Sequence, residues 1–86
     1  MTISAKKALI LRSLCAEIAE VEHSRPHMEA LIGRYAPEQG LKLVFQGGTN
    51  IARMHGIAGS ATEGVAAALA SWSRAARRAM LQAGVL

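Results

Sequence analysis

Apolar side chains recur every three or four residues through the last third of the sequence, which is the period of an α-helix. At about 100° per residue, six of them share one stripe: Val65, Leu69, Trp72, Ala76, Met80 and Ala83. Ser60 and Glu63 precede the stripe with the spacing of a capping box, and Gly84 follows it as a stop signal. The pattern predicts a helix over residues 61–83 that buries Trp72.

A second stripe with the same period lies near the start of the chain, after Ser4, a residue type that caps helices. Its members are Leu11, Leu14, Cys15, Ile18 and Val21. The stripe predicts a helix that ends near Glu22, with Leu9 on the far side of it. We therefore expect two long terminal helices that enclose a short middle region.

The middle region begins with signals for a short helix. Ser24 and Pro26 suit its first turn, and the helix is expected to end near Tyr35 because Pro37 disfavours helical conformation in the residue before it. Residues 41–45 (LKLVF) fit a strand, since apolar and polar residues largely alternate between glycines, and they also fit a helix that starts at Pro37. We favour the strand, which then needs a partner in a terminal segment, in a second copy or in a foreign chain.

Residues 49–55 predict a second short helix, capped by Thr49 or Asn50 and ended by Gly56. Residues 49–72 have the rough cadence of a helix-turn-helix. Their second helix, however, opens without a basic or amide side chain to contact base edges. A simple packing corner between two helices is the favoured interpretation.

The composition supports a mainly α fold in a single domain over residues 1–86. The chain is rich in alanine and has one Phe, one Tyr and one Trp, which suits closely packed helices better than a β-sandwich. The predicted fold is a small helical domain with long N- and C-terminal helices, two short middle helices and the one short strand at 41–45.

Basic residues supply the candidate binding surface. The formal net charge is +4, and Arg74, Arg77 and Arg78 fall on the face of the last helix opposite its apolar stripe. Arg53 follows the Gly-rich turn FQGGTN and is the fourth candidate for contact with a partner or with nucleic acid. A solvated helix face is the favoured explanation of the three helical arginines, and a binding surface is the alternative. Their mixture with aliphatic side chains favours a protein partner over nucleic acid.

The acidic residues Glu17, Glu20 and Glu22 oppose the dipole of the first helix, since they stand near its C-terminus. One compensating arrangement places them beside Arg74 and Arg78, in the same chain or in a dimer mate. Water and salt can equally tolerate the mismatch.

No catalytic or metal-binding set is predicted. The chain has no aspartate, and its one cysteine, Cys15, falls in the buried stripe. His23, His27 and His55 are scattered, and Pro26 separates the first two, so we predict no metal and no cofactor.

A cytoplasmic protein is expected, because one thiol suits a reducing compartment and no apolar run approaches the length of a membrane span or signal peptide. The short chain, the unpaired strand and two leucines outside the apolar stripes, Leu9 and Leu81, predict a homodimer. The expected function is that of a non-enzymatic regulatory protein that binds another macromolecule, for example a phage-type inhibitor of a host nucleic-acid-targeting complex. The alternative is a nucleic-acid-binding transcriptional regulator that uses the C-terminal arginines.

Overall fold

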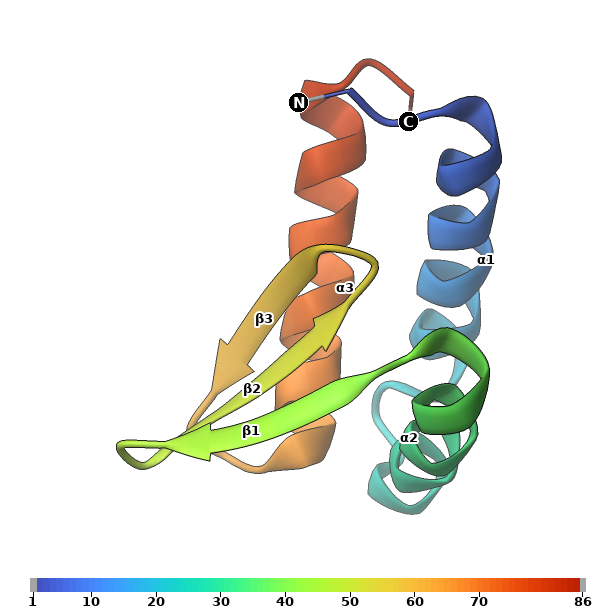
Figure 1. The fold of residues 1–86 in the computed structure, drawn as a ribbon. Coiled ribbons are helices and arrows are strands. Elements are labelled where there is room, and N and C mark those ends of the chain that lie inside the picture. Colours follow the sequence, from blue (N-terminus) through green and yellow to red (C-terminus); the bar gives the residue numbers. More distant parts are fainter. Residues whose placement is uncertain (1, 86) are drawn as a thin grey trace.

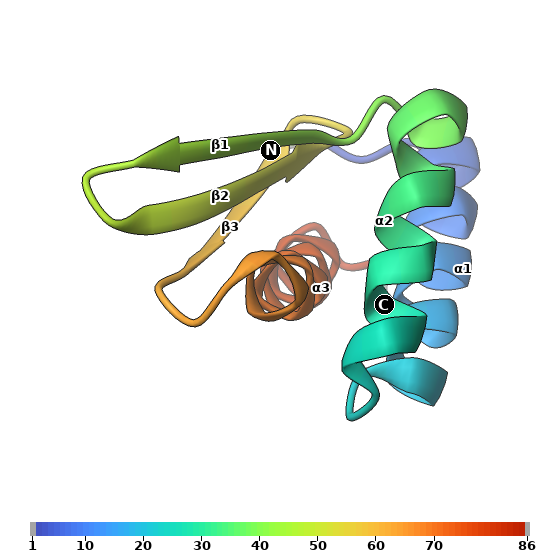
Figure 2. The same cartoon turned by 90° about the horizontal axis from the view of Figure 1, so that it is seen from below.

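The structure is a computed structural model that describes residues 2–85, which form three helices and three strands (Figure 1). Along the chain these are α1 (Ala5–Val21), α2 (Arg25–Gln39), β1 (Lys42–Gln46), β2 (Thr49–Met54), β3 (Ile57–Ala61) and α3 (Val65–Gln82). The strands form one antiparallel sheet in the order β1-β2-β3. α3 packs across one face of this sheet, and α1 and α2 lie together beside α3 (Figure 2).

The prediction of a mainly α fold with one short strand is wrong, because the chain has an α+β fold. The predicted helix over 49–55 is β2 followed by a tight turn. Two two-residue turns build the sheet, and all four of their residues have positive φ: Gly47 (58°), Gly48 (80°), His55 (54°) and Gly56 (74°). This conformation is that of a type I′ hairpin turn, whose twist matches that of the strands it joins. The favoured packing corner of two helices over residues 49–72 is therefore wrong, and a helix-turn-helix is absent there as well, because β2 and β3 occupy the first part of this range.

The predicted capping box is also wrong. Ser60 lies within β3, and α3 begins only at Val65, with Gly64 as an N-cap that makes no side-chain hydrogen bond. The Glu63 carboxylate instead accepts a hydrogen bond of 2.6 Å from the hydroxyl of Thr62. The Ser-x-x-Glu spacing here spans the junction of a strand and a helix.

The two terminal helices are confirmed within a few residues of their expected ends. In α1, Ser4 caps the helix through a 3.1 Å hydrogen bond from the Lys7 N–H to the Ser4 Oγ. α2 is longer than expected, because it continues through Pro37 to Gln39 and is followed by Gly40 in the left-handed conformation. The Gly40 N–H bonds to the Tyr35 carbonyl, so the glycine, and not the proline, stops the helix.

The strand expected at 41–45 is confirmed with a shift of one residue, but its expected partners were wrong. β1 pairs with β2 of the same chain, with Lys42 opposite Arg53 and Val44 opposite Ile51. β1 therefore needs no second copy of the chain as its pairing partner.

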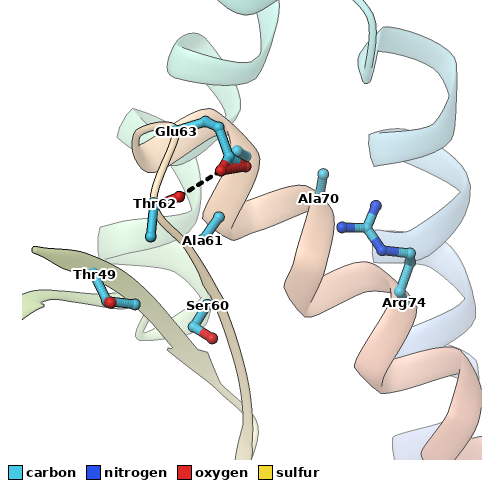
Figure 3. A pocket seen from close by; sticks show the side chains of 8 residues that line it. Thr49, Ser60, Ala61, Thr62, Glu63, Ala70 and Arg74 are labelled. Carbon is cyan, nitrogen blue, oxygen red and sulfur yellow. Dashed lines mark hydrogen bonds between the residues drawn. The ribbon is translucent and has the colours of Figure 1, made fainter.

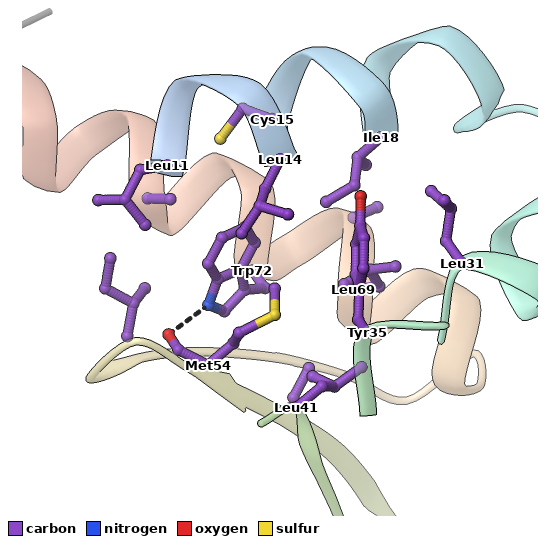
Figure 4. Packing of buried hydrophobic residues seen from close by; sticks show 14 of the residues in the cluster. Leu11, Leu14, Cys15, Ile18, Leu31, Tyr35, Leu41, Met54, Leu69 and Trp72 are labelled. Carbon is purple, nitrogen blue, oxygen red and sulfur yellow. Dashed lines mark hydrogen bonds between the residues drawn. The ribbon is translucent and has the colours of Figure 1, made fainter. Parts of the chain in front are cut away.

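Trp72 lies at the centre of the core, as its position in the apolar stripe predicts (Figure 4). Its side chain is fully buried, and its indole Nε1 donates a 3.0 Å hydrogen bond to the Met54 carbonyl. The buried apolar side chains of α1, α2, β2, β3 and α3 form one cluster with it. Trp72 thus links the sheet to the helices through both packing and a polar contact.

β3 and α3 touch backbone to backbone at Gly59. A Cβ atom built on Gly59 would lie 2.1 Å from the Trp72 backbone nitrogen and 2.4 Å from the Trp72 Cα. Only glycine permits this approach, because neither backbone can move without disturbing the sheet or the core.

We expect Gly59→Ala to lower the free energy of unfolding by about 3 kcal/mol or more, since the new methyl group overlaps backbone atoms of α3. Gly33→Ala is the matched control, because a Cβ there meets nothing within 4 Å. It should be neutral or stabilise α2 by about 0.5–1 kcal/mol. Urea denaturation followed by circular dichroism measures both, and equal stability of the two variants would contradict the close contact.

Candidate functional site

Three of the four candidate arginines lie together on α3. Arg74, Arg77 and Arg78 are exposed, and at about 100° per residue they cover roughly 100° of the helix surface. Leu81 falls within the same arc and is 67% exposed. These four residues are called the arginine face below, and they are turned away from the buried side of α3.

The fourth candidate, Arg53, lies elsewhere. In β2 the side chains of Ala52 and Met54 are buried toward α3, so Arg53 projects from the opposite, open face of the sheet. The sheet itself separates Arg53 from α3. Its direct neighbour across the strands is Lys42, which is also exposed. The structure therefore contains an arginine face on α3 and a separate basic pair on the sheet.

The ion pairs found within residues 2–85 involve neither of these surfaces. They join Arg25 to Glu29 at 3.3 Å, and Arg34 to Glu17 at 2.8 Å and to Glu38 at 3.7 Å. All three pairs belong to α1 and α2. Among the described residues, the arginine face and the Lys42–Arg53 pair thus carry positive charge without a carboxylate in contact.

The structure does not place the acidic end of α1 beside the arginine face of the same chain. α1 and α3 run antiparallel, since Arg12 donates a hydrogen bond to the Val85 carbonyl and the Cys15 Sγ lies 3.6 Å from the Ser73 carbonyl oxygen. This orientation brings the lysine end of α1, rather than its glutamate end, toward the C-terminus of α3 (Figure 1).

Glu17 instead finds its partners in α2. Its carboxylate accepts hydrogen bonds from the Tyr35 hydroxyl at 2.5 Å and from the Arg34 guanidinium at 2.8 Å. The Tyr35 bond, followed by the Arg34 bond, lowers the pKa of Glu17, while burial together with the Glu17 contact raises the pKa of Tyr35. The cluster fixes α1 against α2.

A shallow, open groove of about 550 Å³ lies between β3 and the first half of α3 (Figure 3). It is lined by Thr49, Ser60, Ala61, Thr62, Glu63, Ala67, Ala70 and Arg74. The lining contains no histidine, cysteine or lysine, and its hydroxyl–carboxylate contact is the hydrogen bond between the adjacent residues Thr62 and Glu63. The groove is a depression lined mostly by small residues, with one negative charge from Glu63 and one positive charge from Arg74.

The histidines and the cysteine are dispersed. The His27 Nδ1 lies 2.6 Å from the Ser24 Oγ, and the His55 Nε2 lies 2.9 Å from the Gln39 Oε1. Burial, with Lys7 nearby, lowers the pKa of His55, and Cys15 is buried in the core. Within residues 2–85, no three His, Cys, Asp or Glu side chains group closely enough to hold a metal ion. In the same part of the chain, no helix combines the length and apolar character that a membrane crossing requires.

The surface that sequence reasoning missed is β1. All five of its residues are exposed, among them three large apolar side chains: Leu43 at 40%, Val44 at 41% and Phe45 at 70%. Phe45 is the only phenylalanine of the chain. The alternation of residues 41–45 pointed to the strand, but it could not show that α3 would leave this strand uncovered.

Comparison with known proteins yields no match to a family model, to a curated protein or to a solved structure.

The Glu17 cluster makes stability depend on pH. Because the pKa of Glu17 is lower in the folded protein than in the unfolded chain, its stabilisation is present above the unfolded value of about 4.3 and is lost as the pH falls through the folded value. Glu17→Gln should reduce the loss of Tm between pH 7 and pH 3. Glu29→Gln, which removes an exposed pair with Arg25, is the control and should change this loss less. Thermal melts at both pH values measure the difference, and identical losses in the two variants would contradict it.

Proposed function

We propose that this protein is a non-enzymatic interaction protein that acts by binding another protein. The observation that carries the proposal is the exposure of β1, an edge strand with Phe45 70% exposed. In an isolated protein, such a strand is normally shortened, charged or covered, because its unpaired backbone invites another strand. Exposed aromatic side chains beside it are typical of the anchors that dominate binding energy.

The distribution of aromatic residues supports this proposal. The chain has three aromatic side chains, and two of them, Trp72 and Tyr35, are almost completely buried. Phe45 alone is placed on the surface, in a chain whose small core would gain from burying it. Covering a phenylalanine side chain stabilises a complex by about 1.5–3 kcal/mol.

A protein of this kind acts stoichiometrically on its partner, as regulators and inhibitors do. Self-association remains part of the proposal on two grounds: the small size of the chain and the exposure of Leu9 (65%) and Leu81 (67%).

Affinity capture from the native host tests the proposal. Phe45→Ser should lose the captured protein, because it removes the largest exposed apolar side chain of β1 without touching the core. Leu9→Ser is the matched control, since Leu9 is exposed to a similar degree but lies on α1. Capture that survives Phe45→Ser, or that Leu9→Ser abolishes equally, would contradict binding through β1.

Nucleic-acid binding is the second candidate function, and the arginine face favours it. Arg74, Arg77 and Arg78 share one exposed arc and have no carboxylate in contact among residues 2–85. Arginines so arranged can contact successive phosphates of a nucleic-acid backbone.

Replacement of all three by glutamine should then weaken binding to random duplex and reduce the slope of log K against log salt by about 2–3. Arg25→Gln on α2 is the single-site control. Random duplex that fails to bind at 50 mM salt, or an unchanged slope in the triple variant, would exclude this function.

A further inference from the structure

The outer edge of β1 carries free backbone hydrogen-bonding groups at two positions. Gln46 and Thr49 flank a two-residue hairpin turn, so they form a hydrogen-bonded pair, and Val44 and Ile51 form the next such pair. The N–H and C=O groups of Leu43 and Phe45 therefore point away from β2. None of the backbone hydrogen bonds outside the ladder within residues 2–85 involves either residue.

The outer edge of β3, on the opposite side of the sheet, makes a hydrogen bond to α3. There the Ser60 N–H, which points outward from β3 by the same alternation, donates to the Ser71 Oγ of α3 at 3.2 Å. α3 packs against β3 and β2 and does not cover β1. One outward group of β3 is thus bonded within the protein, whereas no such bond is found for Leu43 or Phe45 of β1.

The side chains of β1 present different chemistry on the two faces of the sheet. Leu43 and Phe45 share the face of the buried Ala52, but α3 packs on β3 and β2 and leaves these two side chains exposed. Lys42 lies on the open face directly opposite Arg53, so two positive charges meet across the strands. Like charges in directly opposed positions destabilise a sheet. Within residues 2–85 neither side chain forms an ion pair.

We propose that the edge of β1 binds an extended segment of a partner protein as a fourth, antiparallel strand, with a carboxylate of the partner opposite Lys42. The carboxylate relieves the repulsion between Lys42 and Arg53, and apolar side chains at alternate positions cover Leu43 and Phe45. The partner segment therefore alternates apolar and polar residues and has an acidic residue at the Lys42 end. This inference rests on the proposed function and specifies the chemistry of its partner.

A second copy of the chain does not supply this chemistry. A two-fold axis can pair the outward groups of Leu43 and Phe45 with those of the copy in three registers. In these registers, the residue of the copy opposite Lys42 is Gln46, Val44 or Gly48. None is acidic, so the repulsion between Lys42 and Arg53 would persist, and the observations favour a foreign segment.

The test uses a fluorescently labelled peptide, Gly-Ser-Thr-Ile-Thr-Val-Glu-Ser-Gly, whose central residues oppose β1 when it binds antiparallel. Its affinity for the full chain, measured by fluorescence polarisation, should exceed that of the Glu→Lys peptide by about fivefold to tenfold. Lys42→Glu should reverse this preference. Lys6→Glu is the matched control, since it changes the net charge equally and Lys6 is exposed on α1, so the preference should persist.

Backbone methylation tests the strand geometry. N-methylation of the peptide at Ile and Val, which oppose Phe45 and Leu43, should abolish binding, because it removes the amides that bond to β1. N-methylation at the central Thr and at Glu places the methyl groups on the outer edge and should preserve binding. Equal loss with both peptides, no preference for glutamate, or no binding of the parent peptide would overturn the proposal. So would a β1-mediated dimer that excess peptide does not dissociate.

The experiments distinguish failure of the proposed function from failure of the proposed partner strand. If Phe45→Ser loses the native partner but the peptide preferences are absent, binding through β1 stands and the acidic strand is wrong. If native capture is independent of Phe45, the proposed function itself is wrong, whatever the peptides do. Circular dichroism of each variant confirms that it is folded.

Discussion

The contact between Gly59 of β3 and the backbone of α3 at Trp72 is the constraint on which the remaining architecture depends. It allows a strand and a helix to approach more closely than any side chain would permit. The close approach brings the Trp72 indole within 3.0 Å of the Met54 carbonyl, and so connects β2 to the same point. The core then forms around Trp72, between the sheet and α1 and α2.

This contact also explains why β1, at one edge of the sheet, is not covered by a helix. α3 is centred on β3 and β2, and its Ser71 hydroxyl accepts a hydrogen bond from the outward N–H of Ser60 in β3. A helix centred between β3 and β2 reaches about 5–6 Å to either side, and the axis of β1 lies about 7 Å from that midpoint at a strand spacing of about 4.8 Å, so α3 stops short of β1. β1 is therefore left with both apolar side chains and backbone groups in solvent. The geometry that stabilises the core creates the surface to which we assign binding.

The charged side chains divide between the α1–α2 junction, where they are paired, and the surfaces of α3 and the sheet. The ion pairs of the described residues join α1 to α2 or lie within α2, and the Glu17–Tyr35 contact adds a partly buried hydrogen bond to this junction. The basic groups of α3 and of the open sheet face are left for solvent or for a partner. An acidic strand at β1 and an anionic surface at α3 could thus be recognised independently.

The sequence by itself determined the elements whose signals are local. The period of apolar residues set both terminal helices and the burial of Trp72, and Ser4 marked the start of α1, because these signals act within a few turns of one helix. Glycines around residues 41–45 marked β1. Residues 49–61 were misread, since Ile51, Ala52 and Met54 fit a short helix as well as a strand, and Ser60 and Glu63 match a capping box by spacing alone. Only the tertiary structure decided between these readings. Strand pairing and the Gly59 contact join residues that are distant in sequence, and so does the choice of which edge α3 covers, so no local pattern contains them.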